Sequence, residues 1–206
     1  MCGFVAVISK SGRPVCPETV QKMSQDINHR GPDDSGFWLN DWCGLGMRRL
    51  SIVDLSERGH QPMFDPTGTY GIVYNGEVYN ASNLRKELEV QGVIFTSVSD
   101  TEVVLQAYIH WREAYLDRFV GMFAFIIVKV PTREFFIARD QLGIKPLYYC
   151  ENEDFIFFSS EIKALRHGTT FALNHAVLYE QLVFRYVAGE STPFKGIWKF
   201  PVGHYW

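Results

Sequence analysis

The order of the expected strands and helices is the feature that most restricts the fold of this chain. Short runs of β-branched and aromatic residues, each ended by turn residues, predict strands at 3–8, 36–39, 45–48, 71–74, 122–130, 134–138, 147–149 and 155–158. Apolar spacing predicts helices at 17–28, 82–91, 101–111, 161–165 and 176–184. Strands and helices occur in blocks and do not alternate as they do in a parallel α/β sheet. An α+β fold of two mainly antiparallel sheets covered by helices is therefore expected.

Composition excludes several classes of function. The 206 residues are 47% apolar and carry a net charge of −3, so a real core is expected and a basic nucleic-acid-binding face is not. The longest apolar run, 120–128, is too short to span a bilayer, and no signal-peptide stretch precedes the second residue. The lack of a signal-peptide stretch predicts a cytoplasmic protein. The four cysteines form no CxxC pair, which predicts reduced thiols and no metal site, and the lack of a Walker-type motif predicts no nucleotide-phosphate loop.

Cys2 directly follows the initiator methionine. Removal of Met1 would leave Cys2 with both a thiol and a free α-amino group, so that one residue carries a nucleophile and a base. An N-terminal amine has a pKa of about 7.7–8.0 and can therefore accept the thiol proton near neutral pH. On its position alone, Cys2 is more simply explained as the residue that heads a buried strand.

The Asn75-Gly76 pair has two interpretations. After the strand that ends at Tyr74, an exposed Asn amide beside a Gly N–H group would provide two donors for an oxyanion. The same dipeptide is the strongest short-range signal of a β-hairpin turn.

Two charged segments suggest how a zwitterionic ligand is held. Arg49, at a strand end, could bind a carboxylate through two hydrogen bonds, although taken alone a solvated arginine pair with Arg48 is the simpler explanation. Asp100 could bind an ammonium group, whereas Ser99 or Asp100 as the N-cap of the following helix is the ordinary explanation. A carboxylate site and an ammonium site together are what an α-amino acid requires.

These residues lie within a series of motifs whose order resembles that of one family, the N-terminal glutaminase domain of glutamine-hydrolysing asparagine synthetases. The motifs are Met1-Cys2-Gly3, His29-Arg30-Gly31-Pro32-Asp33, Arg49-Leu50-Ser51-Ile52-Val53-Asp54, Tyr74-Asn75-Gly76-Glu77-Val78-Tyr79-Asn80, Ser99-Asp100-Thr101-Glu102, Gly121-Met122-Phe123-Ala124-Phe125, Ala138-Arg139-Asp140, Gly143-Ile144-Lys145-Pro146-Leu147-Tyr148-Tyr149 and Ser160-Glu161-Ile162-Lys163-Ala164-Leu165. The resemblance covers nearly the whole chain. It implies a class II glutamine amidotransferase with the four-layer αββα sandwich of N-terminal nucleophile hydrolases.

The resemblance also implies roles for individual residues. Cys2 would attack the side-chain amide of glutamine, with Asn75 and the Gly76 N–H group stabilising the oxyanion. The residues expected to bind the substrate are Arg49, Ile52, Val53, Glu77 and Asp100, with Arg49 on the α-carboxylate and Asp100 on the α-ammonium group. Arg30 and Asp33 would support the N-terminal residue. Gln141 stands where the family often has arginine, which bears on domain contacts more than on hydrolysis.

The resemblance divides the chain into a glutaminase domain at 2–190 and an exit segment at 191–206 that leads to an ATP-dependent synthetase domain. The SGGxDS loop of that domain does not occur here, so ATP and Mg are expected only in a missing part or a separate chain. We expect that the chain is truncated, because Trp206 beside Tyr205 is a poor solvent-facing terminus. A homodimer is a separate expectation about partners. Transfer of ammonia to aspartate is the first expectation. There are two alternatives. The acceptor belongs to polysaccharide or secondary-metabolite synthesis, or the chain is a non-catalytic interaction domain if Met1 is retained.

Overall fold

The computed structural model describes residues 1–52, 54 and 56–206. Its strands form two sheets in which every pair of neighbouring strands is antiparallel. The first sheet has the order β10-β8-β9-β1-β3-β2 and the second has the order β4-β5-β6-β7. The strands are β1 (Gly3–Ser9), β2 (Asp34–Leu39), β3 (Cys43–Arg49), β4 (Met63–Phe64), β5 (Tyr70–Val78), β6 (Gly121–Lys129), β7 (Glu134–Arg139), β8 (Tyr148–Glu151), β9 (Phe155–Ser159) and β10 (Ile197–Lys199).

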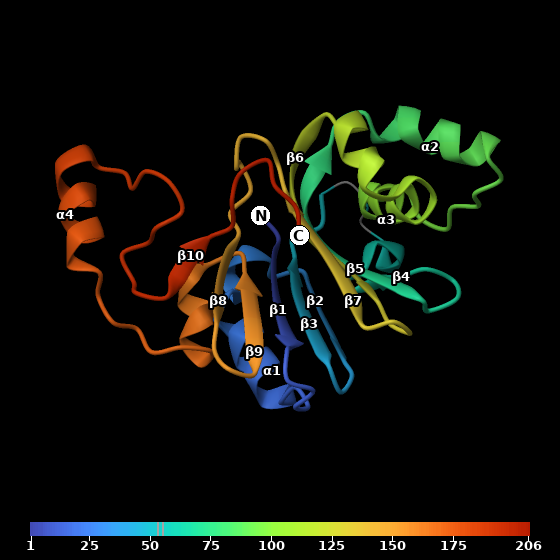
Figure 1. The fold of residues 1–206 in the computed structure, drawn as a ribbon. Helices are drawn as coiled ribbons and strands as arrows, with labels where there is room; N and C mark the ends of the chain where they lie inside the picture. Colours follow the sequence, from blue (N-terminus) through green and yellow to red (C-terminus); the bar gives the residue numbers. More distant parts are fainter. Residues whose placement is uncertain (53, 55) are drawn as a thin grey trace.

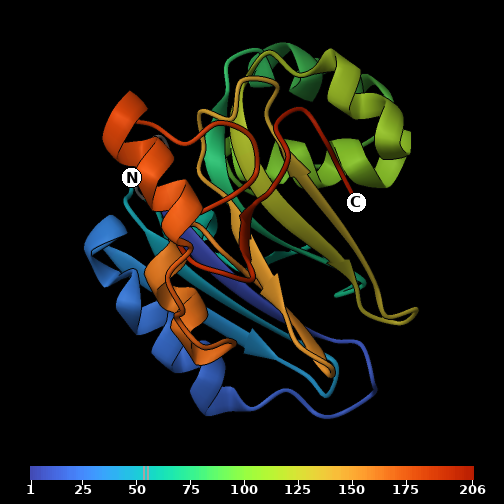
Figure 2. The ribbon, with the colours of Figure 1, turned by 60° about the vertical axis from the view of Figure 1, so that its left-hand side comes forward.

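Helices cover the outer faces of both sheets. The α-helices are α1 (Pro17–Asp26), α2 (Ala81–Val90), α3 (Asp100–Trp111) and α4 (His175–Phe184), and the 3-10 helices are η1 (Asn28–Arg30), η2 (Glu57–Gly59), η3 (Arg112–Arg118) and η4 (Ile162–His167). The two sheets pack face to face, with α1 outside the first sheet and α2 and α3 outside the second, while α4 stands away from both (Figure 1, Figure 2).

Alternating side chains along the strands produce three separate cores. Phe4 and Ala6 of β1 pack between the two sheets, whereas Val5 and Val7 of the same strand pack against α1 and η4. The third core, which includes Tyr74, lies between the second sheet and the helices α2 and α3. Because a strand buries both faces only when a layer lies on each side, three cores confirm the predicted four-layer αββα sandwich.

Most predicted elements are present, and the differences have physical reasons. β5 does not end at Tyr74 in a turn: it continues through Asn75 and Gly76 to Val78, because β6 pairs with it along its whole length. The expected helix at 161–165 is the 3-10 helix η4, and the short edge strands β4 and β10 were not predicted. Gly92 ends the second predicted helix as expected, with a φ of 90°.

The last residues of the chain pack on both sheets. β10 pairs with β8, Phe200 is fully buried in the core between the sheets, and the backbone of Trp206 exchanges two hydrogen bonds of 2.9 Å with Ile137. The boundary at residue 190 stays a prediction. Among the described residues, no helix is both long and apolar enough to cross a bilayer.

Candidate active site

A cavity of about 360 Å³ brings together most of the site residues that the sequence predicts. It lies where β1 and α3 begin, where β3 ends, and along the last half of β5. Its lining includes Cys2, Arg49, Ile52, Asn75, Gly76, Glu77 and Asp100. Arg30 and Asp33 are not part of this lining, and Val53 lies outside the described residues.

Cys2 is held at the edge of the cavity by contacts on both its thiol and its backbone. The Leu50 N–H group donates to Sγ at 3.4 Å, and Sγ lies 3.5 Å from the Leu50 carbonyl oxygen. Arg30 Nε donates to the Cys2 carbonyl oxygen at 2.9 Å. A Cβ atom at Gly3 would lie 2.7 Å from Arg30 Cδ, so the Cys-Gly sequence allows this close approach of the guanidinium.

Arg30 is itself held by an ion cluster on the outside of the molecule. Its Nη1 lies 3.1 Å from Glu161 Oε1, and the same oxygen accepts from His29 Nε2 at 2.8 Å. Lys163 Nζ lies 3.3 Å from Glu161 Oε2. Burial alone would raise the pKa of Glu161, but hydrogen bonds from Arg30, His29 and Lys163 outweigh it and lower the pKa below its usual range.

Asn75 carries a buried donor that has no partner. The residue is 2% exposed, and its Nδ2 makes no hydrogen bond among the residues that the structure describes. The prediction of an exposed amide in a turn is therefore wrong: the amide belongs to a buried strand residue that lines the cavity. A buried amide donor without a partner is costly unless a ligand satisfies it.

Gly76 is fixed by the closeness of its neighbours. A Cβ atom there would lie 2.6 Å from the Met122 carbonyl oxygen and 2.7 Å from the ring of Tyr74. Since real side chains do not tolerate such distances, only glycine lets β5 and β6 stay paired at this point of the cavity.

Arg49 is buried and already donates to the loop that follows it. Its Nη1 donates to the Ser56 carbonyl oxygen at 3.2 Å, its Nη2 donates to the Asp54 carbonyl oxygen, and Nη1 lies 3.9 Å from Asp34 Oδ2. The interpretation as a solvated surface arginine is therefore wrong. Because a guanidinium has five N–H groups, donors remain for a ligand in the cavity.

Asp100 opens α3, but it does not cap the helix. Ser99 is the N-cap, and its side chain accepts from the Thr101 N–H group at 3.2 Å. Asp100 Oδ2 instead accepts from the Tyr74 hydroxyl at 2.7 Å and from the Val78 N–H group at 3.1 Å. Burial raises the pKa of Asp100 and, with the charge of Asp100 added, raises the pKa of Tyr74 well above its usual range.

The remaining predicted residues lie at the rim or behind the site. Ile52 and Glu77 are exposed residues of the cavity lining. Asp33 acts on the backbone next to Cys2: its Oδ2 accepts from the Ser51 N–H group at 2.9 Å, and Ser51 follows Leu50, which contacts the thiol.

Sequence reasoning gave no role to several further residues of the lining, among them Gln61, Tyr74 and Lys145. Gln61 joins β5 to α3, since its Oε1 accepts from the Tyr74 N–H group at 2.6 Å and its Nε2 donates to Thr101 at 3.2 Å. Tyr74 and Lys145 lie inside two of the motifs, which was a usable signal. Gln61 lies outside all of them.

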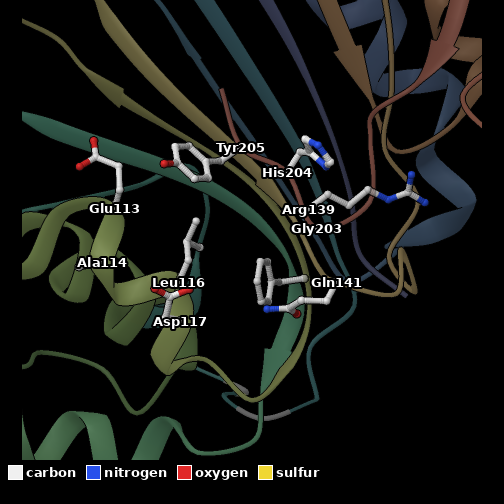
Figure 3. A pocket seen from close by; sticks show the side chains of 10 residues that line it. Glu113, Ala114, Leu116, Asp117, Arg139, Gln141, Gly203, His204 and Tyr205 are labelled. Carbon is white, nitrogen blue, oxygen red and sulfur yellow. The ribbon is translucent and has the colours of Figure 1, made fainter.

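A second cavity of about 350 Å³ shares no lining residue with the first. Glu113 and Asp117 of η3 line one side, and Gln141, His204 and Tyr205 lie across from them (Figure 3). The guanidinium of Arg139 points away from the two carboxylates and donates to the carbonyl oxygens of Lys145, Gly143 and Phe200. Gln141, the departure from the family pattern, thus lines a different cavity from Cys2. Within the described ranges, no three or more His, Cys, Asp or Glu residues gather as a metal site.

Comparisons with known proteins identify the family to which the chain is similar. The family model described as a glutamine amidotransferase domain matches residues 1–206. Asparagine synthetase [glutamine-hydrolyzing] 1 of Bacillus subtilis (strain 168) is 41% identical over 93% of this chain and 31% of its own length. A putative asparagine synthetase of Methanocaldococcus jannaschii is 38% identical over 80% of the chain and 35% of its own length. "Amidase chry2" of Gibberella zeae is 33% identical over 100% of the chain and 32% of its own length.

A solved structure supports the fold. Glutamine phosphoribosylpyrophosphate amidotransferase from B. subtilis, complexed with ADP and GMP, superposes with a TM-score of 0.69 at 21% identity, over 80% of this chain and 43% of that one. The chain spans about a third of the length of the curated relatives it matches. The chain therefore belongs to the glutamine amidotransferase domain family, and it is homologous to the glutamine-hydrolysing asparagine synthetases.

Proposed function

We propose that this chain hydrolyses glutamine to glutamate and ammonia through the thiol of Cys2. Once Met1 is removed, the α-amine of Cys2 takes the thiol proton, through a water molecule, and the thiolate attacks the side-chain amide carbon. The C–N bond breaks as the amine returns the proton to the leaving ammonia. Water then attacks the thioester, which releases glutamate and restores the thiol.

One observation carries this proposal: the Nδ2 donor of Asn75 is buried, lacks a partner in the described part of the chain, and shares a cavity with Cys2. The negative oxygen of the tetrahedral intermediate is the acceptor that such a donor lacks. The Gly76 N–H group is the second donor in this assignment.

Recognition of the amino acid uses the two charged residues that line the same cavity. Arg49 binds the α-carboxylate with the guanidinium donors that its loop leaves free, and Asp100 binds the α-ammonium group. Glu77, Ile52 and Val53 complete the substrate contacts in this proposal. Arg30 holds the backbone of Cys2 directly, and Asp33 acts through the loop that contains Leu50.

The proposal is tested by intact mass and by glutamate release from glutamine. We expect a loss of one methionine mass, measurable glutamate release, and no release by Cys2→Ala. Activity in protein that keeps Met1 would contradict the role of the α-amine. Activity in Cys2→Ala would contradict the nucleophile itself.

We further propose that the ammonia passes to an ATP- and Mg-dependent synthetase domain, either in a longer form of the chain or in a separate cytosolic partner. The names of the relatives at 34–41% identity favour aspartate as the acceptor. The match to a protein named an amidase keeps a different acceptor as the second candidate. Product analysis of the chain together with its synthetase partner, supplied with glutamine, ATP and aspartate, separates the two, since only the first forms asparagine.

A further inference from the structure

Tyr74 lines the cavity and contacts Asp100, and the reaction described above gives this contact no role. Its ring is buried against α2 and α3, and its hydroxyl lies 2.7 Å from Asp100 Oδ2. Both this hydrogen bond and the one from the Val78 N–H group end on Oδ2. The other carboxylate oxygen, Oδ1, is therefore the one left for a cation in the cavity.

We propose that Tyr74 is a positioning residue that selects substrates carrying an α-ammonium group, because its hydroxyl holds Asp100 ionised and turned toward the cavity. The inference rests on the proposed binding of glutamine by Asp100. A tyrosine hydroxyl that donates to a carboxylate stabilises the ionised form, so it offsets the burial that favours the neutral acid. A neutral Asp100 would lose its attraction for an ammonium group, whereas a ligand without that group would be unaffected.

The surroundings of Asp100 make this hydrogen bond important. Asp100 lines two adjoining cavities, and Glu77 lines both as well. The other charged residues are Arg49, Asp54 and Lys145 in the first cavity and Arg85, Lys86 and Glu89 of α2 in the second. Burial is the main cause that raises the pKa of Asp100; hydrogen bonds from Tyr74 and the Val78 N–H group lower it, and charge repulsion from Glu77 adds to the rise. The hydroxyl of Tyr74 is the side-chain donor among these groups that contacts the carboxylate directly.

The test compares two ligands that differ only in the α-amino group: glutamine and glutaramate, its amine-free analogue. Tyr74→Phe removes one oxygen and keeps the ring. The variant loses a hydrogen bond to a charged group, which stabilises the ionised form of Asp100. We therefore expect the preference for glutamine over glutaramate to fall about five- to tenfold. The fall should come from the KM for glutamine with little change in kcat. Glutaramate is measured as a substrate or as a competitive inhibitor.

Tyr70→Phe is the matched control. Tyr70 lies four residues earlier on the same face of β5, in the same core, and its hydroxyl contacts Arg112 at 2.9 Å, away from the cavity. The preference for glutamine should not change in this variant. In an Asp100→Asn background, Tyr74→Phe should likewise have no further effect on the preference, because the acidic group that it acts on is absent.

The pH dependence provides a second readout. Protonation of Asp100 should reduce the preference for glutamine as the pH falls, and Tyr74→Phe should move this decline to higher pH because the ionised form loses a donor. Because the preference is a ratio of the values for the two ligands, the titration of groups that act on both ligands, such as Cys2, cancels. If Tyr74→Phe weakened the use of both ligands equally, or weakened neither, the inference would be overturned, although the glutaminase activity would remain. Failure of the wild-type protein to release glutamate would instead overturn the proposed function.

Discussion

At the scale of single residues, the site depends on two neighbours that face opposite layers. Both residues line the cavity that contains Cys2, but Tyr74 also packs into the core against α2 and α3, to which Asn75 does not belong. Asn75 contributes nothing visible to the stability of the fold through Nδ2, because that donor has no partner among the described residues. Residues retained at such a cost are expected at functional sites.

Asn75→Ala should therefore separate activity from stability. We expect kcat for glutamine hydrolysis to fall by about 10²–10³, with a smaller change in KM, because the lost donor acts on the transition state. The free energy of unfolding in urea should stay the same or rise, since an unsatisfied buried amide is removed. A large loss of stability together with unchanged kcat would show that the amide has a structural role instead.

At the scale of elements, the first turn of α3 is tied down by a chain of side-chain hydrogen bonds. Glu102 accepts from the N–H and hydroxyl groups of Thr96 and Ser97, and Ser97 Oγ accepts from the Ser99 N–H group at 3.2 Å. Ser99 then caps the helix. This network places Asp100 at the cavity, and so the position of a binding residue is set by the capping of its helix.

Ser99→Ala removes that cap. We expect a loss of about 1 kcal/mol in the free energy of unfolding and a decrease in Tm of about 2–4 °C, measured by thermal denaturation. The KM for glutamine should rise as well, because Asp100 is the next residue. Ser82→Ala in the exposed first turn of α2 is the control, and an equal effect of both changes would argue against the role of the cap.

The same elements show how far sequence reasoning reaches. The strands around Phe4 and the helix that contains Asp100 were predictable, because alternation and capping are local signals. The turn at Asn75-Gly76 was wrong, because pairing with β6 along all of β5 overrides the local preference of that dipeptide.

Contacts between distant residues account for the rest of the site. Tyr74 and Asp100 are 26 positions apart, and they meet only because the register of β5 turns the ring toward α3. The hydrogen bonds of Arg49 likewise end on the backbone carbonyl oxygens of Asp54 and Ser56, acceptors that every residue carries. Neither contact leaves a periodic pattern in the sequence.

At the scale of the whole molecule, ion pairs connect parts of the chain that are far apart in sequence. Glu161, after β9, joins His29 and Arg30 of η1, and Arg30 in turn holds Cys2. The nucleophile is thus connected to the outer surface through one guanidinium and one carboxylate.

Glu161→Gln tests this connection through the pH dependence of stability. A carboxylate whose pKa is lowered in the folded state stabilises the protein above its unfolded pKa, which is about 4.3 for glutamate, and loses that contribution as the pH falls through the folded value. Urea denaturation should show that the variant is less stable than the wild type at neutral pH, with a difference that shrinks below about pH 4.3. Glu151→Gln, which breaks an exposed pair with Lys10, is the control and should show little change at any pH. A Glu161→Gln difference that is independent of pH would contradict this role of the ion cluster.

The opposite directions of Tyr74 and Asn75 have a consequence for protein engineering. If the two residues act as proposed, adjacent positions of β5 set the choice of ligand and the rate of bond breaking. The two side chains nevertheless lie in different layers with different neighbours. Libraries directed at the helix-side layer around Tyr74 and Asp100 can then alter which substrates are accepted while the side chain of Asn75 stays untouched. A shift of β5 by a single residue would exchange the two layers and abolish both properties together.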